Sequence, residues 1–382
     1  MTSARFLAIC TLIAASSALI LWGEWTGTMR EIDRRSHHIV RLGTRVKPVQ
    51  TTVKGLYLTA YSAGTEKKLD EIIALIDRTE LNAVVIDIKD YSGTVLFPAT
   101  VPLTKELGLT KNTLGDVGAV IKKLHRHGIY VIARQTVFQD PLLASKKPEW
   151  AIRSKTGGVW RDRKGLSWVD PTRREIWEYN AALAREAIRL GFDEINFDYV
   201  RFPTDGNMSD VVYTNGEDML FDVMGKFYAY LHDELGSLPA PISLDFFGFV
   251  MERHDGMTIG QRLEDARDRV DVISPMMYPS HYPAGHLGFA NPADYPREVI
   301  DHGLTVGLPY VASSTTKIRP WIQAFNLGAV YSAEKIRAEI DAVEKHSDAG
   351  WLLWNAANRY TDAGLQPAEL PELQKLQKPR QL

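Results

Sequence analysis

The sequence contains a single cysteine, Cys10, among 382 residues, so it cannot form an internal disulfide. Its stability must come from packing. Basic and acidic residues almost balance, with a net charge of −2, and this balance gives no support to nucleic acid as a partner. The chain is rich instead in apolar groups, with 45% hydrophobic residues and nine tryptophans. Such a composition suits a large core or a sugar-binding surface.

Motifs of several enzyme classes are also missing. Residues 62–65, after the first predicted strand, lack the glycine-rich phosphate fingerprint, which counts against an open doubly wound sheet. No G-x-S-x-G elbow occurs, so a serine hydrolase is poorly supported. The first predicted strand has no His-x-His, and no third histidine joins His281 and His286 at a strand end. We therefore predict no metal and no cofactor.

Only one long hydrophobic run is present, over residues 6–22. At about 1.5 Å per residue it is roughly 25 Å long, slightly less than the ~30 Å of a bilayer core. Small residues at 14–18 offer cleavage sites for a signal peptide, whereas the apolar run continues beyond them and favours a membrane anchor. We predict a signal peptide or anchor over 1–23 and a stalk over 24–53. The protein is then extracytoplasmic, either anchored or secreted.

From residue 54 onward, strand-like and helix-like segments alternate. The strands are almost continuously apolar, and the helices carry apolar stripes such as Leu69, Ile72, Ile73 and Ile76. Eight such units in ~310 residues predict an α/β fold, a (β/α)8 TIM barrel over 54–362, followed by a tail over 363–382. The predicted strands are 55–63, 83–90, 129–137, 193–203, 241–249, 271–278, 317–325 and 350–355, with 305–311 as an alternative seventh strand.

The segment 194–203, EINFDYVRFP, carries the clearest functional signal. Strict alternation puts Glu194, Asn196 and Asp198 on one face and three apolar or aromatic residues on the other. Outer helices should cover the apolar face, so the polar face points into the barrel, where an unpaired carboxylate is expensive. Because barrel enzymes keep their chemistry at the C-terminal ends of strands, we predict that Asp198 is catalytic.

A second carboxyl group, Asp245 in SLDFFG, lies on the next predicted strand. Adjacent strands lie ~4.8 Å apart, so Asp198 and Asp245 can reach the ~5–9.5 Å separation that glycoside hydrolysis uses. We expect Arg201 to keep one carboxyl group ionised and dry surroundings beside Phe246 and Phe247 to keep the other protonated. The structural alternative is an ion pair between Asp198 and Arg201, with Asp245 capping a loop.

Other polar and aromatic residues near the predicted strand ends are candidates for substrate binding. Asp87 and Lys89 share a face of the second strand, where they either pair with each other or contact substrate. The candidates for substrate binding are Asp87, Lys89, Arg134, Arg201, Tyr278, His281, Trp321, Gln323, Trp354 and Asn355.

The segment 139–170 is longer than a barrel loop needs, and long loops in compact domains tend to be functional. It holds Trp150, Trp160 and Trp168 among seven Lys and Arg residues. Exposed tryptophans would stack on sugar rings and the basic groups would attract acidic substituents, which predicts an anionic glycan. Alternatively, the tryptophans pack inward.

The chain resembles a glycoside hydrolase family of bacterial TIM-barrel proteins that was first catalogued as a domain of unknown function. The resemblance spans residues 55–361, and α-amylase-like barrels are similar more distantly. The segments on which the resemblance rests are, in order, LYLTAYSAG, VVIDIKDYSG, EINFDYVRFP, SLDFFG, SPMMYPSHYP, IRPWIQAF and LLWNAANRY.

This resemblance implies a barrel that acts on a polysaccharide or cell-envelope glycan. A nucleophilic Asp follows strand four in α-amylase-type barrels, matching Asp198, and an acid/base carboxylate follows strand five, matching Asp245. The α-amylases use Glu at the second position. Because Asp is shorter and reaches less far, the resemblance does not decide whether the reaction retains or inverts the anomeric configuration. Residues 305–316 depart in another way, since we predict them to be less helical than the family pattern.

The sequence thus predicts a glycosidase, with Asp198 as nucleophile or base and Asp245 as general acid. Arg201 and Tyr278 would orient the substrate. Two alternatives come from other classes: a non-catalytic glycan-binding barrel, and a metal-dependent glycan deacetylase or other hydrolase.

Overall fold

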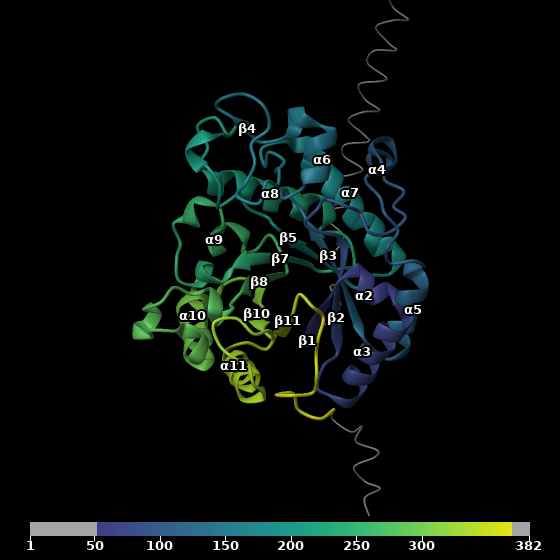
Figure 1. Cartoon of the computed structure of the whole chain (residues 1–382), viewed down its shortest axis with the longest axis vertical. Coiled ribbons are helices and arrows are strands. Elements are labelled where there is room, and N and C mark those ends of the chain that lie inside the picture. The colour runs from purple at the N-terminus through teal and green to yellow at the C-terminus, as the bar shows by residue number, and fades with distance from the viewer. Residues whose placement is uncertain (1–51, 369–382) are drawn as a thin grey trace, which may run out of the picture. The chain divides into compact units, whose positions relative to one another are not determined.

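In the computed structural model, which describes residues 52–368, eight parallel strands form a closed barrel (Figure 1). Each strand pairs with its neighbour along the chain, and the last pairs with the first. The predicted (β/α)8 barrel is therefore confirmed. The strands are β1 (Val53–Leu58), β2 (Ala83–Lys89), β3 (Tyr130–Thr136), β5 (Glu194–Asp198), β7 (Ile242–Phe247), β8 (Val272–Met276), β10 (Trp321–Gln323) and β11 (Gly350–Trp354).

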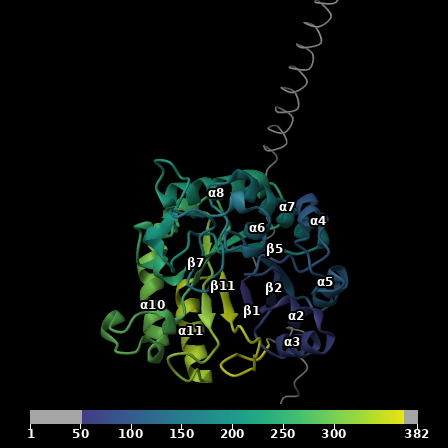
Figure 2. The ribbon, with the colours of Figure 1, turned by 45° about the horizontal axis from the view of Figure 1, so that its top comes forward.

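Helices surround the barrel on its outside (Figure 2). Each presents one apolar stripe to the strands, as in α3, where all four predicted stripe residues are buried. The main helices are α3 (Glu66–Arg78), α5 (Val117–Arg126), α7 (Arg174–Leu190), α8 (Leu220–Leu235), α10 (Pro296–Gly307) and α11 (Ala333–His346). Shorter elements in the loops are α2 (Ala60–Gly64), α4 (Pro102–Leu107), α6 (Pro141–Lys146), α9 (Leu263–Ala266) and a two-stranded antiparallel sheet of β4 (Arg153–Ser154) with β6 (Val211–Val212).

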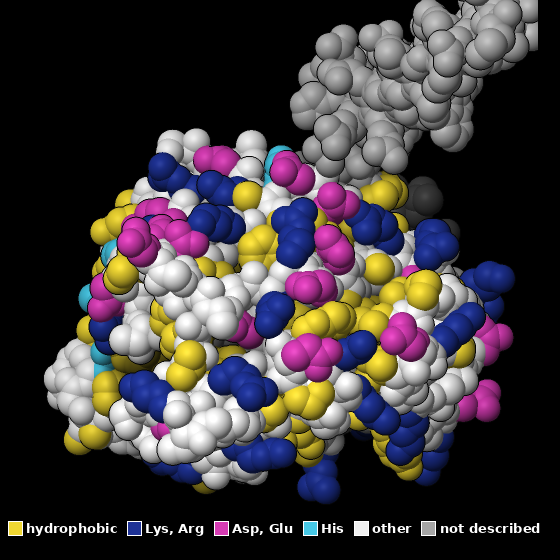
Figure 3. Space-filling view, turned by 90° about the horizontal axis from the view of Figure 1, so that it is seen from above, with side chains coloured by type: hydrophobic (Ala, Val, Ile, Leu, Met, Phe, Trp, Pro, Cys, Tyr) yellow, Lys and Arg dark blue, Asp and Glu magenta, His cyan; other side chains and the backbone are white. Residues whose placement is uncertain are grey.

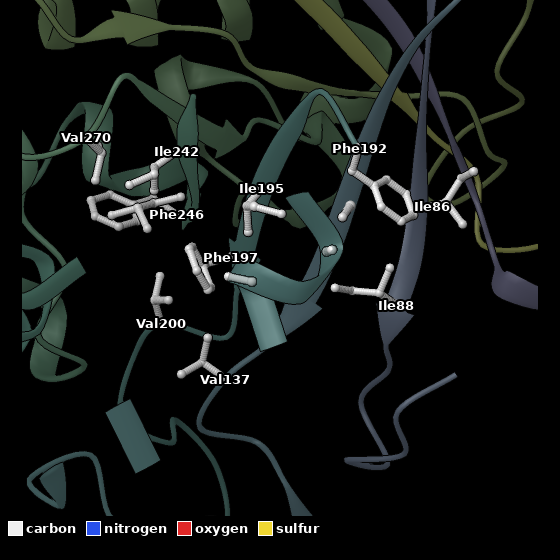
Figure 4. Packing of buried hydrophobic residues seen from close by; sticks show 14 of the residues in the cluster. Ile86, Ile88, Val137, Phe192, Ile195, Phe197, Val200, Ile242, Phe246 and Val270 are labelled. Atoms are coloured by element: carbon white, nitrogen blue, oxygen red, sulfur yellow. The ribbon is translucent and has the colours of Figure 1, made fainter. Parts of the chain in front are cut away.

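Strand β5 shows the predicted alternation. Ile195 and Phe197 face the helical layer, where they are fully buried beside Val137 and Val200 (Figure 4). Asn196 and Asp198 therefore point into the barrel. The strand ends at Asp198 because Tyr199 has a φ of 54°, in the left-handed region that breaks extended structure.

Three predicted segments differ in the structure. The first strand stops at Leu58, and the Thr59 side chain accepts a hydrogen bond from the Ser62 N–H at 3.1 Å to begin α2. The seventh strand does lie within 317–325, but Pro320, which has no N–H to donate, separates β9 (Lys317–Ile318) from β10. Helix α10 continues through Gly307 into a 3-10 turn over Leu308–Tyr310, so the prediction of reduced helicity is wrong there.

The predicted signal or anchor segment lies outside the described residues. Within 52–368, no helix is both long enough and apolar enough to cross a membrane.

Replacing Phe197 with alanine should lower the free energy of unfolding by about 3–5 kcal/mol, because a fully buried ring would leave a cavity between β5 and the helices. Denaturant unfolding measures this loss. The control is Val330→Ala at a side chain that is 77% exposed, which should change stability by less than about 0.5 kcal/mol. Equal effects of the two changes would contradict the packing described here.

Candidate active site

A single guanidinium group, that of Arg134 on β3, contacts three carboxyl groups inside the barrel. Its Nη1 donates to Asp87 Oδ1 at 2.5 Å, and its Nη2 donates to Asp198 Oδ2. Its Nε lies 3.8 Å from Asp245 Oδ2. All four side chains are at most 7% exposed. They come from four neighbouring strands, β2, β3, β5 and β7, whose inward-facing positions the parallel register brings together.

Asp245 lies in a dry, hydrogen-bonded position. Its Oδ1 accepts hydrogen bonds from Asn196 Nδ2 at 2.8 Å and Trp321 Nε1 at 2.7 Å. Burial, followed by the negative charge of Asp198, raises the pKa of Asp245 to about 8, against the opposing effect of Arg134. The carboxyl group of Asp245 is therefore mostly protonated at neutral pH.

Asp198 is placed as an acceptor of hydrogen bonds at the end of β5. Besides the bond from Arg134, its Oδ1 accepts the backbone N–H of Tyr199 at 2.5 Å. That bond accompanies the left-handed backbone of Tyr199. Such a conformation is uncommon for a bulky residue and is frequent at functional sites, where surrounding structure maintains it.

Asp87 completes the set of carboxyl groups. Its Oδ2 accepts the Tyr57 hydroxyl at 2.5 Å, and burial raises its pKa despite Arg134 and Tyr57. The Tyr57 ring stacks on Trp354 at 4.1 Å between centroids, and the guanidinium carbon of Arg134 lies 5.2 Å from the Trp354 ring. Asp87 therefore orients Arg134 and Tyr57 and does not line the cavity described next.

A cavity of about 480 Å³ opens over this network. Its size falls in the range of small-molecule sites, ~300–1,000 Å³. Asp198 and Arg134 belong to its wall, whereas Asp245 and Trp321 are not among its lining residues. The lining residues are Arg134, Asp198, Tyr199, Arg201, Phe247, Gly248, Phe249, Met276, Tyr278, His281, Tyr282 and Trp354.

Among the predicted binding residues, Tyr278, His281, Trp354, Arg134 and Arg201 line this cavity. Burial raises the pKa of Tyr278 far above its usual value and lowers that of His281. Both side chains are therefore neutral near pH 7.

The structural alternative, an ion pair between Asp198 and Arg201, is wrong, since the cation bound to Asp198 is Arg134. Arg201 instead donates from Nη1 to the carbonyl of Phe202 at 3.0 Å. Sequence reasoning included Arg134 only as a substrate-binding candidate. The position of Arg134 in the middle of an apolar strand gave no sign that three carboxyl groups would share its guanidinium.

Lys89 is placed outside the barrel, so its predicted contacts with Asp87 or substrate are wrong. A β-bulge puts two residues of β2, Ile88 and Lys89, opposite Gln135 alone. The Lys89 side chain therefore points out of the barrel, on the same side of the sheet as that of Gln135. There it is fully buried and pairs with Asp140 at 2.7 Å.

Two other predicted binding residues brace loops at this end of the barrel. Gln323 is fully buried and donates from Nε2 to the Phe325 carbonyl at 2.9 Å. Asn355 donates from Nδ2 to the carbonyl of Ala324 at 2.6 Å. Neither lines the cavity, and Trp321 acts through its bond to Asp245.

The tryptophans of the long loop do not form an exposed platform. Trp160 and Trp168 are 2% and 1% exposed, and Trp150 is partly buried. The inward-packing alternative is therefore correct for Trp160 and Trp168. On the face shown in Figure 3, Lys and Arg side chains are interspersed with Asp and Glu.

The lining residues that were not predicted are Tyr199, Phe247, Gly248, Phe249, Met276 and Tyr282. Two of them, Tyr199 and Phe247, lie one and two positions after the predicted carboxylates, so proximity in sequence could have suggested them. Within the described part of the chain, no group of three His, Cys, Asp or Glu side chains is arranged to hold a metal ion.

The sequence profile of a family described as "Putative glycosyl hydrolase domain" matches residues 55–360. A hypothetical protein from Ruminiclostridium thermocellum is 39% identical, with a TM-score of 0.46, over 50% of this chain and 96% of that one. No curated protein matches.

Two more distant structures share the fold. The PgaB (BpsB) glycoside hydrolase domain from Bordetella bronchiseptica has a TM-score of 0.56 at 15% identity, over 83% of this chain and 97% of that chain. The α-galactosidase TtGalA from Thermus thermophilus has a TM-score of 0.51 at 14% identity, over 89% of this chain and 63% of that chain.

The Lys89→Met change should lower the free energy of unfolding by about 3–5 kcal/mol, because it leaves the buried Asp140 without its cation. Adding Asp140→Asn should recover much of this loss, since asparagine can keep the cap on Leu143 N–H. Denaturant unfolding measures both changes. Lys345→Met, at an exposed ion pair, is the control and should cost at most about 1 kcal/mol. A Lys89 variant of normal stability with lost glycan binding would contradict this structural role.

Proposed function

The chain belongs to this family of glycosyl hydrolase domains, and from that premise we propose that it hydrolyses a glycan with Asp198 and Asp245. The observation that carries the proposal is the shared guanidinium of Arg134, which contacts both carboxyl groups, Asp198 in the cavity wall and Asp245 on the next strand. Contact with one guanidinium keeps the two groups within ~9.5 Å, the largest separation that inverting glycosidases use.

The two carboxyl groups occupy different environments, as acid and base in such a pair must. Asp198 belongs to the cavity wall and accepts two hydrogen bonds, which suits an ionised nucleophile or base. Asp245 is 2% exposed, and its high pKa suits a general acid. Its Oδ1 is occupied by Asn196 and Trp321, so Oδ2 is the oxygen that carries the proton.

Hydrolysis then proceeds by proton transfer and substitution at the anomeric carbon. Asp245 protonates the glycosidic oxygen as its bond to the anomeric carbon breaks. Asp198 either attacks that carbon or removes a proton from the attacking water, and water supplies the new hydroxyl. The neutral aromatic wall of Tyr278 and Trp354 gives the sugar an apolar contact surface. The proposed substrate is a polysaccharide or cell-envelope glycan.

Asp198→Asn should abolish turnover while leaving the thermal midpoint nearly unchanged, because the amide keeps the shape but cannot attack or accept a proton. Asp245→Asn should slow hydrolysis of a glycan by about 10²–10⁴-fold. With dinitrophenyl glycosides, whose leaving group needs no protonation, Asp245→Asn should lose much less of its rate. Release of reducing ends and of dinitrophenolate measures these effects.

The matched control is Asp233→Asn, an exposed carboxylate of α8 that is not part of the cavity wall. It should retain full turnover. Wild-type rates in Asp198→Asn would remove the assignment. Glycan binding by the wild-type protein without any product would favour the non-catalytic alternative.

The pH dependence of turnover offers a separate check. A general acid must be protonated, so kcat/KM should be retained below pH 8 and fall about tenfold per unit above it, as Asp245 loses its proton. In Asp245→Asn this fall at high pH should disappear. A wild-type rate that rises through pH 8 would show that the protonated form of Asp245 is not the active one.

A further inference from the structure

Arg201 is a buried cation in the cavity wall that lacks an acidic partner. It is 8% exposed, and within residues 52–368 no carboxylate lies within ion-pair distance of it. Its single hydrogen bond to the protein uses Nη1, so Nε and Nη2 have no acceptor among the described residues. A buried charge is costly unless it is paired, and burial lowers the pKa of Arg201.

The surroundings of Arg201 are aromatic. Its guanidinium carbon lies 4.6 Å from the Phe247 ring, 4.9 Å from Trp168 and 5.2 Å from Tyr199. Cation–π contacts stabilise the charge at the faces of these rings, but they do not satisfy the N–H donors at its edge. Those donors are available to a ligand in the cavity.

The remaining charges of the cavity wall do not neutralise Arg201. Asp198 is the one carboxylate in the wall, and Arg134 already binds it. His281 is neutral near pH 7 because burial lowers its pKa. Asp198, Asp205 and Asp162 act on Arg201 only through longer-range attraction, which raises its pKa against the effect of burial. Among the lining residues, Arg201 is therefore the cation that has no carboxylate in direct contact.

We propose that Arg201 binds the carboxylate of a uronic acid residue in the glycan. A guanidinium edge with free N–H donors matches a planar carboxylate through two parallel hydrogen bonds. We choose the carboxylate over phosphate or sulfate esters because both of its oxygens lie in one plane, as do the donors of the guanidinium fork. Because Arg201 and Asp198 line the same cavity, the acidic sugar lies next to the bond that is cleaved. This inference rests on the proposed function.

The test measures binding of monosaccharides, which contain no bond to hydrolyse. Calorimetric or NMR titration of the full chain compares D-glucuronate with D-glucose, and D-galacturonate with D-galactose. The wild-type protein should bind at least one uronate about tenfold or more tightly than its neutral counterpart, and Arg201→Met should remove this preference. The control Arg163→Met, which removes an exposed charge from the long loop, should keep it.

Equal binding of acid and neutral sugar, or no uronate binding, would overturn the proposal. Tighter binding of glucose 6-phosphate or glucose 6-sulfate than of either uronate would overturn the choice of carboxylate. If Arg201→Met fails to fold, Arg201→Lys, which keeps the charge but loses the two-pronged donor, should still weaken uronate binding by about threefold or more. Unchanged binding in that variant would contradict the proposal. Because no turnover is involved, these outcomes are independent of the Asp198→Asn experiment.

Discussion

One cation shared by three carboxyl groups is the constraint on which this site depends. Arg134 faces Asp87, Asp198 and Asp245 in a region where each side chain is almost completely buried. Three ionised carboxylates around a single guanidinium would leave two uncompensated negative charges away from water, which is costly. The network therefore retains a proton, and Asp245, which has the driest position and two neutral donors on Oδ1, is the group that holds it. The shared guanidinium thus places the two carboxyl groups of the proposed pair, Asp198 and Asp245, in different surroundings.

The barrel itself creates this asymmetry. Parallel register puts inward-facing residues of β2, β3, β5 and β7 side by side, and the end of β5 at Tyr199 brings Asp198 to the cavity wall. Asp245, on the next strand, does not line the cavity, and Trp321 and Asn196 donate to its Oδ1. A difference in surroundings of this kind separates the properties of two chemically identical side chains.

The fold could be predicted from the sequence because its signals are periodic and repeated. Eight apolar strands and the intervening helical stripes all indicate one architecture, and a single ambiguous segment, 305–311, could not change it. Asp198 and Asp245 could be singled out for the same reason, since alternation decides which face a residue takes. The side of the sheet on which Lys89 lies could not be predicted, because one bulged residue moves Lys89 to the outer face of β2. The alternation of apolar and polar residues in the sequence gives no sign of this bulge. The central role of Arg134 was not predicted, because its carboxylate partners lie 47, 64 and 111 positions away in the sequence. No local pattern can reveal contacts at such separations.

Arg134 and Arg201 illustrate how similar side chains acquire different roles from their neighbours. Both are buried, both contact aromatic rings, and both line the cavity. Arg134 is surrounded by acids of the protein itself, so its charge is already matched and its donors at Nη1 and Nη2 are occupied. Arg201 contacts only aromatic faces and one carbonyl, and the carboxylates that attract it lie beyond ion-pair distance, so its Nε and Nη2 donors remain free among the described residues. Binding of an anionic sugar would complete the charge balance of the wall, whereas a neutral sugar would have to cover a buried cation without compensating it. Under the proposed uronate binding, selection for acidic glycans would come from the cost of excluding water from Arg201, in addition to the hydrogen bonds that the carboxylate gains.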